Sequence, residues 1–510
     1  MYDLIIKNAR IIDGTGSPWR RGDVATYDGR IAAVGVAEGE AKVTVDAGDH
    51  CLAPGFIDIH CHSDETIFEN PTAESRILQG VTTELAGNCG GSAAPCAPGD
   101  KQGFASMRAL LNAIDALPPS TNIAMLTGLG TLRAAAMGYK DEPATDAQIA
   151  AMQALAAETM EDGAYGVSSG LIYAPGSYAS TEEIIEVTKA IRPYGGMYAT
   201  HMRNEKSRVV EAVKEAVAIA EGAGVPLEIS HHKVTYKPDW QVTCRMTTAL
   251  IEKARERGID ATCDQYPYRA SSTTLSINIP SWGFDGGVPC LMERLKDPVT
   301  RKKLRDECNE NHLGRWDTVF VADVASTKNA WMAGLSIPDI AAKLGGKDPA
   351  ETVFDIVTEE NNETHEVCFS MCEEDIEYIL KKPYTMVGSD GWAFSLDTPG
   401  KPHPRSFAAF VRVLSHYCLG RKLFPLEEAV RMMTSAPAAK IGLADRGVIK
   451  AGQWADLVLF DPAKLADTPT FALPQQACAG IERVYVNGVL TAMDGRHLGA
   501  RAGRALRRGQ

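Results

Sequence analysis

The chain has 510 residues, of which 45% are hydrophobic and 23% charged, and its formal net charge is -13. This length exceeds one ordinary domain, and the composition is that of a soluble globular protein. The acidic balance argues against a nucleic-acid surface or an anionic membrane as partner, because both need clustered Lys and Arg. The one basic run, Arg501 to Arg508, is expected to be a solvated end.

The sequence also lacks clear targeting and redox signals. The N-terminus has no basic segment followed by a long apolar one, and no window reaches the roughly 18 apolar residues of a membrane span. The cysteines form no Cys-x-x-Cys pair, so neither a disulfide scaffold nor a structural zinc finger is expected. A cytoplasmic enzyme is therefore the default expectation, with no membrane or nucleic-acid partner. The sequence predicts no oligomeric state.

Both chain ends consist of short apolar runs separated by turns. In residues 1–55 the pairs Asp13-Gly14 and Asp28-Gly29 are typical of β-hairpins. Residues 440–495 have the same pattern of short apolar runs and turns, and they contain Asn487-Gly488. We predict one small β-sandwich domain built from these two segments.

The middle of the chain, residues 56–439, alternates apolar runs with helical periods. In Arg208 to Ala223, for example, apolar residues recur at spacings of three and four. Eight strands separated by helices predict an α/β fold, a closed (β/α)₈ barrel, with a doubly wound open sheet as the alternative. The eight expected strands are residues 56–59, 82–86, 123–127, 166–169, 197–200, 227–230, 261–264 and 385–388.

The interval between the seventh and eighth expected strands is irregular. It contains one predicted helix, Leu291 to Cys308, and a strand-like run, Thr318 to Val321. We predict an inserted subdomain over residues 283–345, beside the mouth of the barrel. Its role is not indicated by the sequence.

The first expected strand delivers His60 and His62 to its end. In an extended strand alternate side chains share a face, so these two imidazoles can bind one cation together while Cys61 faces away. A bare His-x-His is more often a coincidence than a metal site. Its position after a buried strand suits a catalytic loop at the carboxyl end of a barrel strand.

Other chemically capable residues also follow expected strands. Cys89 follows the second, His201 the fifth, His231 and His232 the sixth, and Asp390 the eighth. Singly they could be a buried thiol, core histidines and a turn former, but in a barrel all these strand ends form one rim. Imidazole, thiolate and carboxylate together suit Zn²⁺ better than Mg²⁺ or Ca²⁺. The pattern predicts a zinc site.

Several motifs carry a more specific resemblance. The chain resembles the amidohydrolase superfamily and, within it, the N-acyl-D-amino-acid deacylases (D-aminoacylases). The resemblance spans almost the whole middle of the chain. The matching stretches are GFIDIHCHSD from Gly55, GNCGGS from Gly87, SSGLIYAPG from Ser168, THMRNE from Thr200, ISHHK from Ile229, DQYPYRASST from Asp264, VGSDG from Val387 and HPRSF from His403.

The resemblance implies one tightly held zinc and a second, weaker metal position. Most binuclear amidohydrolases bridge two metals with a carboxylated lysine from the fourth strand, but here that strand ends in Ser168-Ser169-Gly170. This departure favours the deacylases over hydantoinases and dihydroorotases. The implied ligands are Cys89, His201 and His231 for the tight zinc, and His60, His62 and Asp390 for the second position.

The implied reaction is hydrolysis of the amide bond of an N-acyl-D-amino acid. Zinc would hold the water and polarise the acyl carbonyl, and Asp390 would act as general base and then protonate the leaving amine. Whether His60 and His62 stabilise the oxyanion or hold the second metal stays open. Arg203 and Glu205 are expected to orient other groups.

The substrate's α-carboxylate needs cationic or hydroxyl partners when it is desolvated. Lys233 is suitably placed after the histidine pair, and the resemblance adds further residues. Two of them have ordinary alternatives, a packed turn for Tyr266 and a surface position for Arg405. The expected carboxylate-binding residues are Lys233, Tyr173, Tyr266, Ser272 and Arg405.

The resemblance also bears on the side chain of the substrate. Family members that prefer acidic D-amino acids carry an arginine shortly after the Tyr-Pro-Tyr stretch, whereas this chain has no Lys or Arg between Arg269 and Arg294. We expect neutral or hydrophobic side chains, unless Arg269 or a cation from the insertion reaches the pocket. A cyclic-amide hydrolase or deaminase, and an inactive scaffold, are the alternatives.

Overall fold

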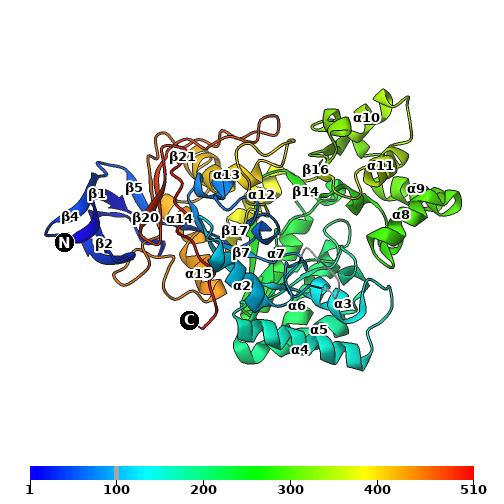
Figure 1. Ribbon diagram of the computed structural model, residues 1–510, viewed down its shortest axis with the longest axis horizontal. Helices are drawn as coiled ribbons and strands as arrows, with labels where there is room; N and C mark the ends of the chain where they lie inside the picture. Colours follow the sequence, from blue (N-terminus) through cyan, green and yellow to red (C-terminus); the bar gives the residue numbers. More distant parts are fainter. Residues whose placement is uncertain (97–102, 510) are drawn as a thin grey trace.

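The computed structural model describes residues 1–96 and 103–509. Figure 1 shows the strands of the two chain ends at the left, parallel strands with their helices in the centre, and a largely helical insertion at the upper right. Within the described residues, no helix is long and apolar enough to cross a membrane.

The two chain ends form one nine-stranded sheet, as expected for a β domain shared by both. Strand β5 joins them, because it pairs in parallel with β1 and antiparallel with β18. The predicted turns Asp28-Gly29 and Asn487-Gly488 both have positive φ at their two residues, as tight hairpins require. The strands are β1 (Tyr2–Ile11), β2 (Arg20–Tyr27), β3 (Arg30–Gly35), β4 (Ala41–Asp46), β5 (Cys51–Pro54), β18 (Leu457–Phe460), β19 (Ile481–Val486), β20 (Val489–Met493) and β21 (Arg496–His497).

All eight strands expected in the middle are present, and the third is divided in two. They form two parallel sheets, in the orders β6-β7-β8 and β17-β13-β12-β11-β10-β9. The strands are β6 (Phe56–Asp58), β7 (Val81–Ala86), β8 (Asn122–Met125), β9 (Thr127–Gly128), β10 (Gly166–Gly170), β11 (Met197–His201), β12 (Leu227–Ile229), β13 (Ala261–Gln265) and β17 (Thr385–Val387).

The two parallel sheets meet at both pairs of edges. Only Leu126 separates β8 from β9, and its backbone N donates to Ala86 O at 2.8 Å. At the other edge, Cys61 and Gly391 pair in parallel just beyond β6 and β17. Asp390 N also donates to His60 O at 2.8 Å there. The carboxyl ends of β6 and β17 therefore lie side by side.

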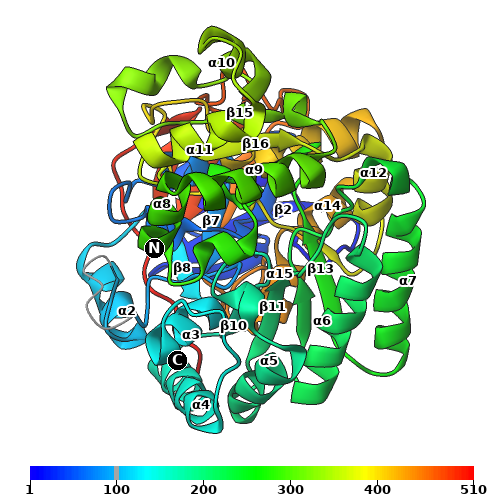
Figure 2. The same ribbon diagram turned by 90° about the vertical axis from the view of Figure 1, so that its right-hand side faces the viewer.

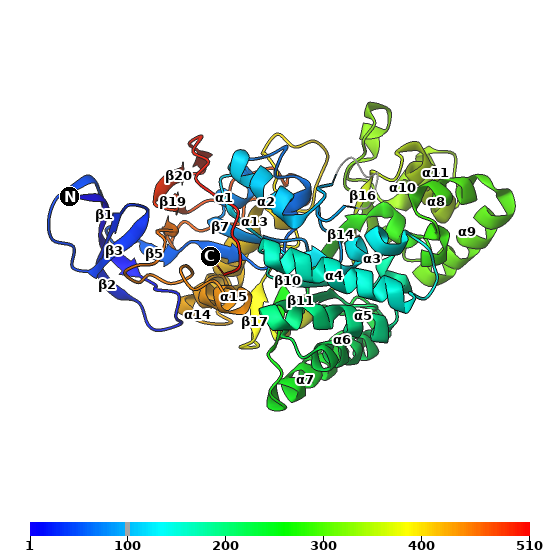
Figure 3. The same ribbon diagram turned by 60° about the horizontal axis from the view of Figure 1, so that its bottom comes forward.

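Helices cover the parallel strands, and Figure 3 shows α4 to α7 following one another along them. The predicted helix at 208–223 is confirmed as α6; its apolar stripe is buried, and Gly224 ends it with a φ of 69°. The helices are α1 (Glu74–Ile77), α2 (Met107–Ala116), α3 (Leu129–Met137), α4 (Asp146–Asp162), α5 (Thr181–Thr188), α6 (Val209–Ala223), α7 (Thr243–Glu256), α12 (Glu373–Leu380), α13 (Arg405–Arg412), which continues as the wider-turned η9 (Val413–Gly420), α14 (Leu426–Met432) and α15 (Ser435–Ile441).

The segment between β13 and β17 has its own antiparallel sheet, in the order β14-β16-β15, and its own apolar core. Its elements begin before residue 283 and end after residue 345. Figure 2 shows its helices α8, α9 and α11 in front of the sheet. The elements are β14 (Ala270–Thr274), η5 (Leu275–Asn278), η6 (Ser281–Phe284), α8 (Val288–Lys296), α9 (Pro298–His312), η7 (Trp316–Thr318), β15 (Val319–Val321), η8 (Thr327–Met332), α10 (Ile337–Lys343), α11 (Pro349–Glu359) and β16 (His365–Phe369).

The prediction of one continuous helix from Leu291 to Cys308 was wrong. The segment is two helices, α8 and α9, which meet at Asp297-Pro298. Proline has no N–H and restricts the residue before it to an extended conformation. The Asp297 carboxylate then accepts from Thr300 N at 2.8 Å and caps the second helix.

The basic end of the chain is not the solvated tail that was expected. Leu506 N donates to Ile123 O at 2.7 Å, and the Leu506 side chain is buried in an apolar cluster with Ala124 and Met197. The Arg508 guanidinium donates to Tyr194 O at 2.9 Å. These contacts lie at the amino ends of the parallel strands, so the tail packs across the end opposite the functional residues.

Candidate metal centre and active site

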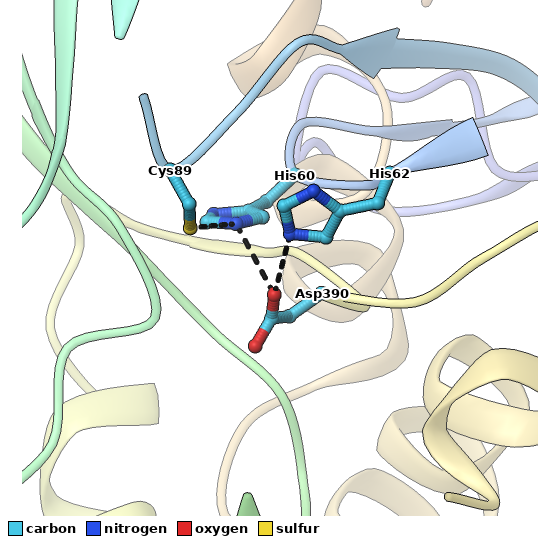
Figure 4. A group of neighbouring side chains, drawn as sticks. All are labelled: His60, His62, Cys89 and Asp390. Carbon is cyan, nitrogen blue, oxygen red and sulfur yellow. Dashed lines mark hydrogen bonds and ion pairs between the residues drawn. The ribbon is translucent and has the colours of Figure 1, made fainter. Parts of the chain in front are cut away.

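The residues expected to bind metal converge at the carboxyl ends of the parallel strands. They form two groups, and within each group the ligand atoms lie within 4.8 Å of one another. Cys89 belongs to both, and Figure 4 shows the first. The groups are His60, His62, Cys89 and Asp390, and Cys89, His201 and His231.

The distances within the first group are short. His60 Nε2 lies 3.4 Å from Cys89 Sγ and 3.4 Å from Asp390 Oδ1. His62 Nε2 lies 3.1 Å from the same carboxylate oxygen. Cys89 Sγ is also 3.4 Å from His231 Nε2, which links the first group to the second. A thiol, a carboxylate and several imidazoles thus face a common space (Figure 4).

Three of these residues have strained backbones. Cys89, His231 and Asp390 have φ values of 53°, 37° and 53°, in the left-handed region that residues other than glycine rarely occupy. Such conformations cost on the order of 1–3 kcal/mol each and cluster at functional sites. The close approach of the Cys89 loop to β10 needs a glycine, since a Cβ on Gly170 would lie 1.9 Å from Cys89 O.

Buried carboxylates orient the histidines. Asp264 Oδ2 lies 3.2 Å from His60 Nδ1, and Glu205 Oε1 lies 3.1 Å from His231 Nδ1, so both Nε2 atoms are left facing Cys89. Glu205 was expected to orient other groups, whereas Asp264 was missed. A charged residue that ends a buried apolar strand is the signal that could have identified it.

His201 gives the strongest indication that these residues suit a metal ion. Within the described structure its Nδ1 and Nε2 are both buried without a hydrogen-bond partner, an arrangement that is rare for buried polar atoms. Burial also lowers its pKa, which favours the neutral ring that binds metals. With the Cys89 sulfur and the His231 ring beside it, the donor set fits a zinc ion.

The electrostatics suit a bound cation. Burial alone would raise the pKa of the Cys89 thiol, but His60 and His231 hold it well below its usual range. Burial would likewise raise the pKa of Asp390, but the nearby Arg405 guanidinium keeps it well below the ordinary value. Burial would lower the pKa of His62, yet its partners Asp390 and Cys89 raise it to about 10. The site therefore concentrates negative charge on a thiolate and a carboxylate.

The residues expected to bind the substrate carboxylate surround this centre. Arg405 is wholly buried, so a surface position is excluded; its Nη1 lies 2.7 Å from Asp390 Oδ2, and its Nη2 donates to Ser272 O at 2.9 Å. Tyr266 lies under this guanidinium, with the ring centroid 4.9 Å from Cζ. Its hydroxyl is buried without a hydrogen-bond partner within the described residues.

Lys233 and Tyr173, two further residues expected to bind the substrate, also lie around this centre. Lys233 Nζ lies 2.7 Å from Glu205 Oε1 and 5.6 Å from the Tyr266 ring centroid. The Tyr173 ring lies 5.2 Å from the His201 ring. His232, by contrast, points away from the site and bonds Thr247 Oγ1 at 3.0 Å.

A buried charged network below the site was also missed. Asp58 Oδ1 accepts from Ser389 N at 2.9 Å and from His60 N at 3.2 Å. The Arg76 guanidinium, wholly buried, donates to Ser389 Oγ at 2.8 Å and lies 3.4 Å from Asp58 Oδ2. The network ties β6 to β17 beneath His60 and Asp390.

Comparison with known proteins places the chain in a class. The model of the amidohydrolase family matches residues 43–270 and 324–492, so the chain belongs to that family. The D-aminoacylase of Alcaligenes xylosoxydans xylosoxydans is 38% identical over 99% of this chain and 98% of that protein. The N-acyl-D-glutamate and N-acyl-D-aspartate deacylases of the same organism are 35% and 36% identical, over 95% and 98% of this chain and 93% of each of those proteins.

Solved structures narrow the class further. A crystal structure of D-aminoacylase is 38% identical with full coverage of both chains and a TM-score of 0.84. Another D-aminoacylase structure, with a TM-score of 0.85, concerns a binuclear metal centre with one-metal activation and second-metal attenuation. An N-acyl-D-glutamate deacylase from Bordetella bronchiseptica, complexed with zinc and a phosphonate inhibitor, is 35% identical over 99% of both chains, with a TM-score of 0.85. Within the metal-dependent amidohydrolases, the chain therefore belongs to the D-aminoacylase, or N-acyl-D-amino-acid deacylase, family.

Proposed function

We propose that the protein hydrolyses the amide bond of N-acyl-D-amino acids, releasing a carboxylic acid and the free D-amino acid. The observation that carries the proposal is the convergence of one thiol, four imidazoles and Asp390 beside two buried cations, Lys233 and Arg405. Such a site offers a metal, a proton acceptor and partners for a carboxylate together, as the reaction needs.

The architecture in this proposal is a closed (β/α)₈ barrel. Contacts at both pairs of edges of the two parallel sheets support closure. The proposed division is a β-sandwich of residues 1–55 and 440–495, a hydrolase domain of residues 56–439 and an insertion around residues 283–345. The expected metal ligands lie at the carboxyl ends of strands, which agrees with the usual position of active sites in such barrels.

We assign the tight zinc to Cys89, His201 and His231 and a second, weaker position to His60, His62 and Asp390. Three protein ligands leave one position of a tetrahedral zinc open, as in catalytic sites. When bound there, zinc polarises a carbonyl and lowers the pKa of a water from 15.7 towards roughly 7. Glu205 keeps the His231 ring turned towards the tight position, and Asp264 holds the His60 ring of the second position.

Asp390 carries the proton in the proposed reaction. Its Oδ1 faces His60 and His62, which follow β6, while Oδ2 is held by Arg405. As the water oxygen bonds to the acyl carbon, Asp390 accepts the water's proton. It then delivers that proton to the amide nitrogen as the C–N bond breaks, so the amine leaves neutral.

The α-carboxylate of the substrate would be bound by Lys233 and Arg405, with Tyr173, Tyr266 and Ser272 around them. Arg405 supplies a planar guanidinium suited to two parallel hydrogen bonds with a carboxylate. The unpartnered Tyr266 hydroxyl, buried beside both cations, supports this assignment.

We propose that the substrate side chain is neutral or hydrophobic. Overall identity does not decide this, because relatives named for D-glutamate and D-aspartate are nearly as similar as the D-aminoacylase. Arg269 offers no support for an acidic side chain: its side chain is 64% exposed and lies 4.0 Å from Glu373.

The test is a substrate panel on the zinc-loaded protein. We expect hydrolysis of N-acetyl-D-leucine and N-acetyl-D-methionine, much slower hydrolysis of N-acetyl-D-glutamate, and little of the N-acetyl-L-amino acids. Preferential turnover of hydantoin or dihydroorotate would replace the proposal with a cyclic-amide hydrolase. Inactivity on every compound, at full metal content, would favour a scaffold.

A further inference from the structure

A buried glutamate lies on the insertion sheet near the metal ligands. Glu366 of β16 is 3% exposed and stands opposite Thr273 of β14 in the antiparallel ladder. Side chains directly opposite one another lie on the same face of a sheet, with Cβ atoms about 5 Å apart. Glu366 and Thr273 therefore project from the same face.

This face is in contact with the candidate active site. The Thr273 hydroxyl bonds the Tyr173 hydroxyl at 3.0 Å. The Tyr173 ring in turn packs edge-on against His201, with centroids 5.2 Å apart. Two side chains thus connect Glu366 to a proposed zinc ligand. Lys206, on the loop after β11, opposes the effect of burial on the pKa of Glu366.

Glu366 is held by a neutral partner. Asn278 of η5 donates from Nδ2 to Glu366 Oε2 at 2.5 Å, and its own Oδ1 bonds His312 Nε2 at 2.6 Å. Across the described ranges, no Lys, Arg or His forms an ion pair with Glu366, and Lys206 is exposed. Burial raises the pKa of Glu366 to about 8. The surroundings of this carboxyl therefore disfavour a negative charge.

We propose that Glu366, held by Asn278, is a specificity-determining residue that forms one wall of the pocket for the substrate side chain. It accepts neutral side chains, including the amides of D-glutamine and D-asparagine, and rejects the matching carboxylates. This inference rests on the proposed deacylase function and deepens it. A substrate carboxylate beside Glu366 lies in a desolvated site without a cationic partner and meets like charge once Glu366 is ionised, whereas an amide both donates and accepts hydrogen bonds.

The test compares N-acetyl-D-glutamine with N-acetyl-D-glutamate, which have the same shape and differ in charge. The ratio of their kcat/KM values is measured for the wild-type protein, for E366Q and for E363Q, a control at an exposed position three residues earlier. Glutamine at position 366 keeps an oxygen for Asn278 but cannot ionise, so the ratio is measured at about pH 9, above the pKa of Glu366, where the wild-type carboxyl is charged.

We expect E366Q to lower the ratio of kcat/KM for N-acetyl-D-glutamine to that for N-acetyl-D-glutamate by about 10-fold or more, through a lower KM for N-acetyl-D-glutamate. Activity on N-acetyl-D-leucine should change little, and E363Q should keep the wild-type ratio. A second variant, N278R, puts a cation within reach of Glu366. It should also lower the ratio of kcat/KM for N-acetyl-D-glutamine to that for N-acetyl-D-glutamate, and it provides the test if E366Q does not fold.

An unchanged ratio in the folded variants overturns the role of Glu366 while leaving the deacylase function intact. It would mean that the carboxyl only fastens η5 to the sheet. Failure of the function itself looks different, because the wild-type protein would then hydrolyse none of the N-acetyl-D-amino acids.

Discussion

Arg405 and Asp390 form a buried ion pair, with Nη1 2.7 Å from Oδ2. The pair fixes one carboxylate oxygen of Asp390 and leaves the other facing His60 and His62. A carboxylate held in this way is available to accept a proton at one defined atom. The geometry suits a residue that transfers a proton between a water and a leaving amine.

The first prediction follows from that assignment. Asp390→Asn keeps the size of the side chain but cannot accept the proton, so kcat should fall by on the order of 10² to 10⁴. The tight zinc should remain, because Asp390 lies outside the group of Cys89, His201 and His231. Steady-state kinetics and metal analysis check both points.

The exposed Asp397 provides the matched control, since Asp397→Asn makes the same change at a residue outside both groups of ligands. Wild-type kcat in a folded, zinc-loaded Asp390→Asn protein would remove Asp390 from the reaction.

The second prediction concerns the C-terminal tail. Leu506 is buried against Ala124 and Met197 at the amino ends of the strands. Leu506→Ala should lower the free energy of unfolding by about 2–4 kcal/mol, the usual effect of removing a buried leucine side chain. Leu498→Ala, at a position 46% exposed, should have an effect below about 1 kcal/mol.

Denaturant unfolding of both variants makes the comparison, with kcat measured in parallel. Equal stability of the two variants would mean that the tail does not contribute to the packed end of the strands.

The third prediction is a pH dependence of stability. The pKa of Glu366 is about 8 in the folded protein, against an ordinary value of 4.5. Between these values the folded state holds a proton that the unfolded state has released, so stability falls as pH rises through this window. The E366Q protein lacks this pH-dependent contribution to stability. Its stability relative to the wild-type protein should therefore increase by up to about 1.4 kcal/mol per pH unit between roughly pH 5 and pH 8.

Urea unfolding of both proteins at pH 5, 6, 7 and 8 measures this difference, with E363Q as control. A stability difference that is constant across these pH values would contradict a buried, protonated Glu366.

Much of the fold could be predicted because its signals are local. The eight parallel strands are short apolar runs, and α6 has a clear apolar stripe ended by Gly224. His60 and His62 could be paired from the period of a strand alone. The division of the third strand at Leu126 and the break of a helix at Pro298 were missed, although proline is a local signal.

Other features depend on residues far apart in the chain, which no local pattern reveals. Asp58 and Ser389 are joined across 331 positions. The basic tail resembles a solvated end by composition, yet its contacts with Ile123 and Tyr194 bury it. The convergence of Cys89, His201 and His231 could be anticipated because barrel strands share a rim, whereas the hydrogen bond between Glu366 and Asn278 depends on how the insertion folds back.

Cys89, His201 and His231 are proposed to hold the zinc on which hydrolysis depends, and metal analysis of Cys89→Ala tests this assignment. Zinc content and kcat/KM for N-acetyl-D-leucine are measured for this variant and for Cys290→Ala, whose cysteine is exposed and remote from the two groups. We expect about one tightly held zinc in the wild-type and Cys290→Ala proteins, and loss of most of the zinc and activity in Cys89→Ala. Wild-type zinc content and activity in Cys89→Ala would contradict this assignment.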